Sequence, residues 1–253
     1  MRLLDLMVPA SCLLCGLPVV HADEWTPAAP PSRTSSATRA RRSLRAPLCE
    51  RCWSLTGPIT HPNRCPVCSI PLPQFVTVCE RCRREEFAFA RAVAACRYAD
   101  APAALVQQFK FSRHRSLASR FAEAMVPLVV EHTPPDAVLV PAPSRRGTVR
   151  RRGFAGAVLI AREIAERTGR SLWNVLQARG HRSQKALSLP ARRSNAAQAV
   201  GLRPGALGGR QIPVHAVLVD DVLTTGTTAD SCARRLLECG VSEVVVVVYG
   251  LEY

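Results

Sequence analysis

The chain has 253 residues, enough for one large domain or for one ordinary domain plus a small module, and its 47% apolar residues exclude wholesale disorder. Its formal net charge of +15 favours polyanionic partners such as nucleic acid or phosphorylated metabolites, although a well-solvated basic surface explains it equally well. No segment reaches the ~18 apolar residues of a membrane helix, and the N-terminus lacks a signal-peptide pattern, so we expect a cytoplasmic protein without a membrane span.

Residues 1–86 are predicted to form a small module organised by metal ions. Eight of the eleven cysteines occur as four C-x-x-C pairs: Cys12/Cys15, Cys49/Cys52, Cys65/Cys68 and Cys79/Cys82. In a cytosolic chain such pairs indicate zinc ligands rather than disulfides, and four thiolates around each ion predict two structural Zn²⁺ sites. We favour a sequential grouping, the first four cysteines and then the last four, and a cross-braced grouping is the alternative.

Residues 22–47 lie inside this module and have a different composition. They are rich in Pro, Ser, Thr, Ala and Arg and carry almost no large apolar side chains. Such a segment cannot bury enough apolar surface to offset the entropy lost on ordering. We therefore expect a flexible, solvated insertion.

Residues 87–253 are predicted to form one α/β domain, a parallel sheet flanked by helices. In chain order we expect extended chain to Tyr98, helices near 101–109 and 117–131, a strand in 136–144, a helix over 154–167 stopped by Gly169, strands at 171–176 and 215–221, a helix over 229–239 stopped by Gly240, and a strand in 241–250. The last two strands are almost unbroken aliphatic runs, which is typical of strands buried on both faces of a parallel sheet.

The stretch VLVDDVLTTGTT, residues 217–228, carries the clearest chemical signal. Asp220 and Asp221 end a central strand, where open α/β sheets bind ligands. The Thr/Gly turn that follows opens a helix, whose unpaired N–H groups and positive dipole end suit a phosphate monoester. Carboxylates repel phosphate but suit vicinal hydroxyls or hydrated Mg²⁺, so a sugar phosphate satisfies both halves of the motif. The stretch lacks the glycine patterns of nucleoside-triphosphate and dinucleotide sites.

This stretch resembles the 5-phosphoribosyl-1-pyrophosphate (PRPP) motif of type I phosphoribosyltransferases. The resemblance implies that Asp220 and Asp221 are the catalytic acids that contact the ribose hydroxyls, with Mg²⁺ as a cofactor. It assigns the 5-phosphate to a loop of five residues: Thr224, Thr225, Gly226, Thr227 and Thr228. It also places a pyrophosphate loop at Ser144 and Arg145, although the arginine-rich segment there fits a solvated basic loop equally well.

Nearly the whole chain, except the 22–47 insertion, resembles the ComF family of phosphoribosyltransferase-like proteins. The matching features are VPAPSRRGTVRRRGF at 140–154, Tyr98 with Lys110 and Phe111, four positions further on (Gln184, Leu187, Arg192, Asn195), and the N-terminal C-x-x-C pairs, which form a double zinc ribbon in that family. Lys110 taken alone suits a phosphate or DNA contact, but a surface lysine is the simpler interpretation. One departure is clear: Ala155 and Gly156 stand where the family usually has Asn-Gln.

Two functional hypotheses follow from the resemblance. The first is a PRPP-dependent phosphoribosyltransferase, a glycosyltransferase in which an acceptor that the sequence does not identify displaces pyrophosphate. The second is a non-catalytic PRPP-sensing or single-stranded-DNA-binding accessory protein of competence. The family link to DNA uptake makes single-stranded DNA and competence proteins the further partners, although only 5% of the residues are aromatic, which weakens base stacking.

Overall fold

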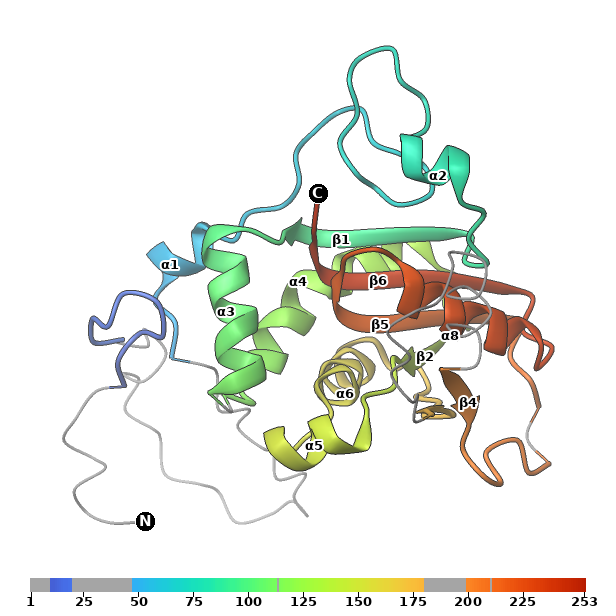
Figure 1. Ribbon diagram of the computed structural model, residues 1–253. Coiled ribbons are helices and arrows are strands. Elements are labelled where there is room, and N and C mark those ends of the chain that lie inside the picture. The colour runs from blue at the N-terminus through green and yellow to red at the C-terminus, as the bar shows by residue number, and fades with distance from the viewer. Residues whose placement is uncertain (1–9, 20–46, 113, 180–198, 210) are drawn as a thin grey trace, which may run out of the picture.

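A computed structural model describes residues 10–19, 47–112, 114–179, 199–209 and 211–253, and its centre is a four-stranded parallel sheet (Figure 1). The strands are β1 (Arg91–Arg97), β2 (Val138–Pro141), β5 (His215–Leu223) and β6 (Glu243–Leu251). They lie in the order β1-β6-β5-β2, and each neighbouring pair runs parallel. The α/β class predicted from the sequence is confirmed.

The two central strands, β5 and β6, are buried on both faces. Val217 pairs with Val245 and Val219 with Val247, and these side chains enter one hydrophobic core. The alternate residues, including Leu218 and its neighbours on β6, enter a second core on the opposite face. Because both faces are covered, the central stretches of these strands, residues 216–219 and 244–248, have no positions for polar residues, which explains their unbroken aliphatic sequences.

Within the described ranges, four helices cover the sheet. The first core packs against α3 (Asp100–Phe111), α4 (Leu117–His132) and α6 (Gly156–Thr168), and the second packs against α8 (Thr227–Leu237). Gly169 ends α6 in the left-handed conformation, as predicted, with φ of +71°. The predicted helix 229–239 begins two residues earlier than expected, at Thr227.

Two sequence-based expectations for the region between β2 and β5 are wrong. The basic segment after β2 is not a loop, since it forms α5 (Arg146–Arg152), whose three final arginines complement the negative end of the helix dipole. Residues 171–176 do not form a regular strand, because only Leu172 pairs with the sheet, at Leu139 of the short strand β2. The chain then enters a separate antiparallel pair, β3 (Leu176–Ala178) with β4 (Val200–Leu202).

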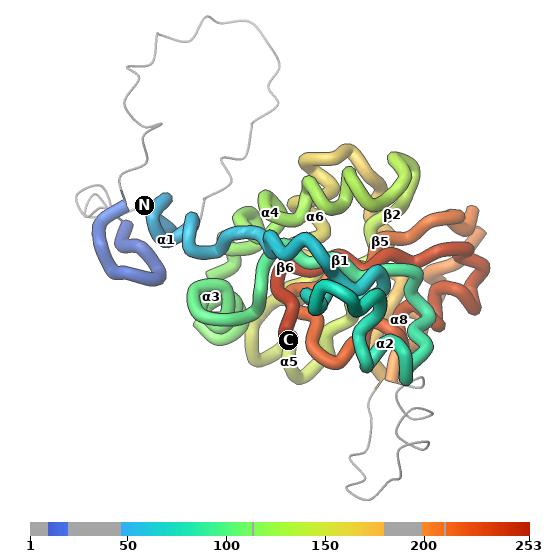
Figure 2. The backbone as a smooth tube through the Cα atoms, turned by 90° about the horizontal axis from the view of Figure 1, so that it is seen from above, coloured from blue at the N-terminus to red at the C-terminus, as the bar shows by residue number. Residues whose placement is uncertain are grey.

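The cysteine-rich region makes two separate contacts with the sheet domain. It contains the short helices α1 (Glu50–Ser54) and α2 (Glu80–Arg84), which lie near opposite ends of β1 (Figures 1 and 2). The α1 part packs on α4, where the buried guanidinium of Arg120 bonds Glu50 at 3.1 Å and lies over the Trp53 ring. The α2 part covers the outer edge of β1, which would otherwise expose unpaired backbone groups.

That edge contact is made by hydrogen bonds from both sides. The N–H of Ala92 donates to the carbonyl of Val67 at 2.7 Å, and the hydroxyl of Ser69 donates to the carbonyl of Ala92 at 2.6 Å.

The division into domains at residues 86 and 87 stays a prediction, and the predicted insertion at 22–47 lies outside the described residues except for Pro47. Over the described ranges, every helix is too short or too polar to cross a lipid bilayer.

Candidate functional site

The loop after β5 turns the chain sharply into α8. Thr224, Thr225 and Gly226 form the turn, and Gly226 occupies the N-cap position of α8 with φ of +79°, a conformation that other residues rarely adopt. A Cβ atom at Gly226 would also lie 3.0 Å from the ring of Phe87. Backbone conformation and close packing therefore both require glycine at the centre of the predicted phosphate loop.

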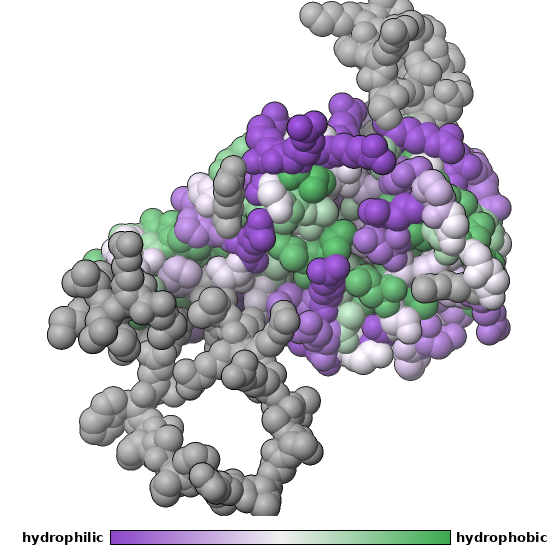
Figure 3. Space-filling view, turned by 90° about the horizontal axis from the view of Figure 1, so that it is seen from below, coloured by the Kyte–Doolittle hydropathy of each residue, from purple (hydrophilic) through white to green (hydrophobic). Residues whose placement is uncertain are grey.

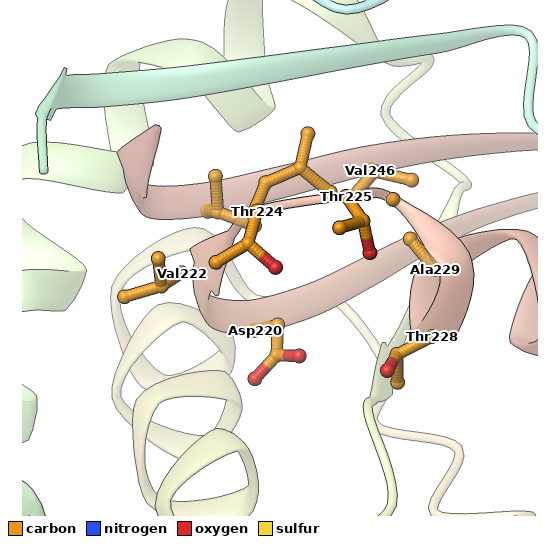
Figure 4. A pocket seen from close by; sticks show the side chains of 10 residues that line it. Asp220, Val222, Thr224, Thr225, Thr228, Ala229 and Val246 are labelled. Atoms are coloured by element: carbon orange, nitrogen blue, oxygen red, sulfur yellow. The ribbon is translucent and has the colours of Figure 1, made fainter. Parts of the chain in front are cut away.

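The loop borders a small cavity of about 50 Å³ at the carboxyl edge of the sheet (Figure 4). Asp220, Thr224, Thr225, Gly226 and Thr228 contribute to its lining. The hydroxyls of Thr225 and Thr227 lie 3.0 Å apart, and all four threonines of the loop are exposed. Because the first N–H groups of a helix have no intrahelical partners, the start of α8 offers donors and a positive dipole end to an anion.

The two adjacent acids do not point into the same space. Successive side chains of a strand alternate between faces, so Asp220 and Asp221 lie on opposite sides of β5. Asp220 is half-buried and lines the cavity, and Figure 4 shows its carboxylate on the same side of β5 as Thr228. Asp221 is buried on the other side, where its Oδ1 lies 2.8 Å from Nζ of Lys110.

Asp220 is held in an unusual electrostatic state. Burial, followed by the negative charge of Asp221, raises the pKa of Asp220 from 3.8 to about 7. The N–H of Asp221, which donates to Asp220 Oδ1 at 2.8 Å, and the charges of Lys110 and Arg152 act in the opposite direction. A carboxyl group that titrates near neutral pH in a cavity is a candidate for ligand binding.

Lys110 is a site residue that the sequence interpretation underestimated. A surface lysine was the simpler expectation, but the side chain is only 19% exposed and pairs with one of the motif acids. One signal in the sequence could have found it: the chain has only two lysines among 34 basic residues. A compact ammonium group at such a position suggests a specific electrostatic role.

A second and larger cavity, of about 370 Å³, lies beyond the carboxyl end of β2. Its polar lining consists of Ser144, Arg146, Arg150, Asn174, Gln177 and Arg203. The underside of the molecule, where α5 and α6 lie, combines hydrophilic and hydrophobic surface (Figure 3). Of the two residues predicted for a pyrophosphate loop, Ser144 lines this cavity, whereas Arg145 is the N-cap of α5 and is not among the lining residues.

The departure from the family pattern at Ala155 and Gly156 has a packing consequence. Ala155 lines the larger cavity, and a Cβ atom at Gly156 would lie 2.8 Å from the Phe109 ring. With Phe109 in this position, a glutamine at 156 does not fit without movement of the aromatic ring. The other family positions, Gln184, Leu187, Arg192 and Asn195, lie outside the described residues.

The eight paired cysteines gather into two clusters, and the grouping is sequential. One cluster contains Cys12, Cys15, Cys49 and Cys52, the other contains Cys65, Cys68, Cys79 and Cys82, and the sulfur atoms within each lie within 4.8 Å of one another. Two sulfur pairs, Cys15–Cys49 and Cys68–Cys79, are separated by 3.8 and 3.6 Å. Tetrahedral zinc with Zn–S bonds of about 2.3 Å requires sulfur separations of about 3.8 Å, so both clusters fit that ion.

The electrostatics of the clusters also favour a bound cation. Burial acts to raise the pKa of Cys12, but backbone N–H groups of Cys15 and Cys49 outweigh it and hold the pKa at about 6. In the same cluster, burial and the neighbouring thiols raise the pKa of Cys52 to about 12. Without a cation, four sulfurs at this spacing cannot all ionise, whereas a divalent ion stabilises four thiolates.

Comparison with known proteins gives relatives that match most of the chain. No protein-family model matches the chain. The DNA utilization protein YhgH of Escherichia coli K12 is 30% identical over 95% of this chain and 96% of its own length, and YhgH of Salmonella typhimurium is 29% identical with the same coverage. Competence protein F of Haemophilus influenzae is 29% identical over 72% of this chain and 82% of its own length.

Solved structures give partial matches. A hypoxanthine phosphoribosyltransferase of Staphylococcus aureus covers 53% of this chain and 62% of its own, with 14% identity and a TM-score of 0.35. An allosteric regulatory enzyme of purine biosynthesis covers 53% of this chain and 25% of its own, with 20% identity and a TM-score of 0.36.

Proposed function

The chain belongs to the ComF family, together with DNA utilization protein YhgH and competence protein F, and we propose that the site after β5 binds PRPP. One observation carries this proposal: Asp220 and the loop that begins α8 line the same cavity at the carboxyl edge of a parallel sheet. A phosphate group and a diol a few ångströms apart match donors on one side and a carboxylate on the other.

Each part of the site has a distinct role in this proposal. The N–H groups and hydroxyls of Thr224, Thr225, Gly226, Thr227 and Thr228 hold the 5-phosphate, whose charge is favourable at the start of α8. Asp220 accepts hydrogen bonds from the ribose hydroxyls. Asp221 acts indirectly, because its partner Lys110 balances the charge that the two adjacent acids place at the end of β5.

The proposal includes two kinds of metal ion. Mg²⁺ would be held by Asp220 together with oxygens of PRPP, since this ion is often bound through one or two carboxylates and substrate phosphates. Mg²⁺ held there would supply positive charge that stabilises the leaving pyrophosphate. The two cysteine clusters would each hold a structural Zn²⁺, because four thiolates leave no open position for chemistry.

The reaction that this site supports is phosphoribosyl transfer. The C1–O bond to pyrophosphate breaks with its electron pair going to pyrophosphate, and a nucleophilic atom of the acceptor forms the new bond to C1. The cavity of about 370 Å³ beyond β2 gives room beside the sheet edge, and Ser144 and Arg146 supply donors to an anion there. The chain contributes positioning and charge stabilisation rather than a covalent intermediate.

Calorimetric titration tests the binding proposal. We expect PRPP with Mg²⁺ to bind the metal-loaded wild type, and Asp220→Ala to weaken that binding by about ten-fold or more through loss of a charge-assisted hydrogen bond. Thr168→Ala, on the far end of α6, is a matched control that should leave the affinity unchanged. The absence of heat in the wild type would refute the proposal.

A second candidate function, binding of single-stranded DNA, is favoured by the basic helix α5. It carries Arg146, Arg150, Arg151 and Arg152 and no acid, in a chain whose relatives are named for DNA utilization and competence. Phosphate contacts of this kind weaken steeply with salt. Titration of a fluorescent oligonucleotide into the wild type and an Arg150→Ala/Arg151→Ala variant, at two salt concentrations, tests it. An affinity that neither salt nor the substitutions change would contradict the idea.

A further inference from the structure

We propose that Arg81 couples the second cysteine cluster to the phosphate loop, so that metal bound by Cys65, Cys68, Cys79 and Cys82 holds the loop in its binding conformation. This inference rests on the proposed function for the role of the loop, but the coupling itself is a property of the protein without ligand. The second cluster thereby becomes part of the ligand site, beyond its role in folding a small module.

The first link is a hydrogen bond between the module and the loop. Nη1 of Arg81 donates to the carbonyl oxygen of Thr224 at 2.7 Å, across 143 positions of sequence. Arg81 stands in α2 between two metal ligands, Cys79 at the N-cap and Cys82 in the helix. A tetrahedral ion bound to both cysteines fixes the first turn of α2, and with it the start of the Arg81 side chain.

The second link is a close packing contact. The ring of Phe87 lies against Gly226, where a Cβ atom would be only 3.0 Å from it, and Phe87 stacks on Phe89 with ring centroids 4.8 Å apart. Phe89 is buried in the core that also receives α8. Phe87, in the chain that leaves the second cluster, therefore packs closely against Gly226, the one residue of the loop without a side chain.

The third link joins the same connecting chain to the first turns of α8. The N–H of Ala88 donates to Asp230 Oδ1 at 2.7 Å, and Arg234 donates both to Asp230 Oδ2 at 2.9 Å and to the carbonyl of Glu86 at 3.2 Å. The second cluster thus contacts the beginning of the loop through Arg81, its centre through Phe87, and the helix that follows through Ala88.

The first cluster has no comparable position. Cys12 and Cys52 belong to the hydrophobic core on the opposite face of the sheet, and α1 is attached to α4 through Arg120. The two clusters are chemically alike but differ in what they contact. Loss of metal from the second cluster should therefore release the phosphate loop, and loss of metal from the first should not.

Hydrogen exchange of the full-length, zinc-loaded chain without ligand tests the coupling directly. We expect Arg81→Ala to raise the exchange rate of the hydrogen-bonded amides in residues 222–230 by about three- to ten-fold, the effect of losing one hydrogen bond. The clearest reporter is the N–H of Asp230, which donates to the carbonyl of Gly226 at 2.8 Å. Arg81→Lys retains a donor and should restore most of the protection. Arg84→Ala is the matched control, because Arg84 lies in the same helix and pairs only with Glu80 of that helix among the partners the structure describes.

Metal removal is tested with two paired variants under the same conditions. Cys12→Ser/Cys15→Ser should leave exchange of the loop unchanged, whereas Cys79→Ser/Cys82→Ser should raise it. If Cys79→Ser/Cys82→Ser unfolds the module, the Arg81 variants decide the question alone, because they keep all eight cysteine ligands. If Arg81→Ala keeps its full metal content and its loop amides exchange as in the wild type, the coupling is overturned.

A parallel titration with PRPP and Mg²⁺ separates this inference from the proposed function. Failure of PRPP to bind the wild type would refute the ligand assignment, while a localised exchange increase in Arg81→Ala would still support the coupling. Where PRPP does bind, linkage requires that it raise the metal affinity of the second cluster, measured by equilibrium competition with a chelator, by the same factor by which the metal improves PRPP affinity.

Discussion

Lys110 of α3 and Asp221 of β5 form an ion pair in which Nζ lies 2.8 Å from Oδ1 and both side chains are largely buried, at 19% and 11% exposure. The pair gives the two adjacent acids different environments. Asp221 has a fixed cation, whereas Asp220 faces the cavity with a pKa that burial and the charge of Asp221 raise to about 7. Neighbouring carboxylates that would repel each other therefore coexist at the end of one strand.

Removing Lys110 should destabilise the fold, because Asp221 would be left as a buried charge without its partner. We expect Lys110→Met to lower the free energy of unfolding by about 3 kcal/mol, the usual cost of breaking a buried pair. Lys110→Met/Asp221→Asn should recover most of that loss, since neither charge remains. Urea denaturation of the three proteins measures it, and equal losses in the single and double variants would show that the pair is not the cause.

Asp220 should make stability depend on pH. Its folded pKa of about 7 exceeds the ordinary 3.8, so between these values the folded state holds a proton that the unfolded state has lost. The resulting stabilisation is present below pH 4 and disappears as pH rises through 7. Asp220→Asn lacks this dependence and should exceed the wild type by about 2 kcal/mol at pH 8, a value reduced by solvent screening of a half-buried group.

Thermal unfolding of both proteins from pH 4 to pH 8 checks this dependence. The difference in free energy of unfolding should grow up to pH 7 and then level off. A difference that is constant over the whole range would contradict the raised pKa.

Gly226 should tolerate no side chain. Gly226→Ala places a Cβ in a left-handed conformation, at a cost of about 1–2 kcal/mol, and also forces it against Phe87. Gly205→Ala is a matched control, because Gly205 has φ of +70° but no atom within 4 Å of its added Cβ. We expect a larger loss of stability at Gly226, accompanied by loss of PRPP binding. Equal effects at the two positions would exclude the Phe87 contact as a constraint.

The cysteine clusters should hold two zinc ions per chain. Elemental analysis of the purified protein should give two, and Cys52→Ser or Cys68→Ser should each reduce the content toward one. After denaturation in a chelator, all eleven cysteines should react as thiols. A zinc-free protein with fewer reactive thiols would show disulfides instead.

The elements that the sequence predicted are those with strong local patterns. The aliphatic runs of β5 and β6, the spacing of α6 and the Thr/Gly turn all follow from residues close together in the chain. Four cysteine pairs likewise indicated two metal clusters, and the structure groups them sequentially.

The features that the sequence did not reveal depend on contacts between distant segments. Nothing near Lys110 predicts that α3 brings it to Asp221, and nothing near Arg81 predicts a bond to Thr224. The separation of Asp220 and Asp221 onto two faces follows from strand alternation, but it becomes visible only when β5 is known to extend through both acids to Leu223.

A crystal structure with PRPP and Mg²⁺ would show directly whether the loop after β5 binds the ligand. We expect the 5-phosphate to lie within hydrogen-bond distance of backbone N–H groups in residues 225–228, with the ribose hydroxyls at Asp220. A phosphate found only beside Arg146 and Arg150 in the larger cavity, with the loop after β5 empty, would contradict it.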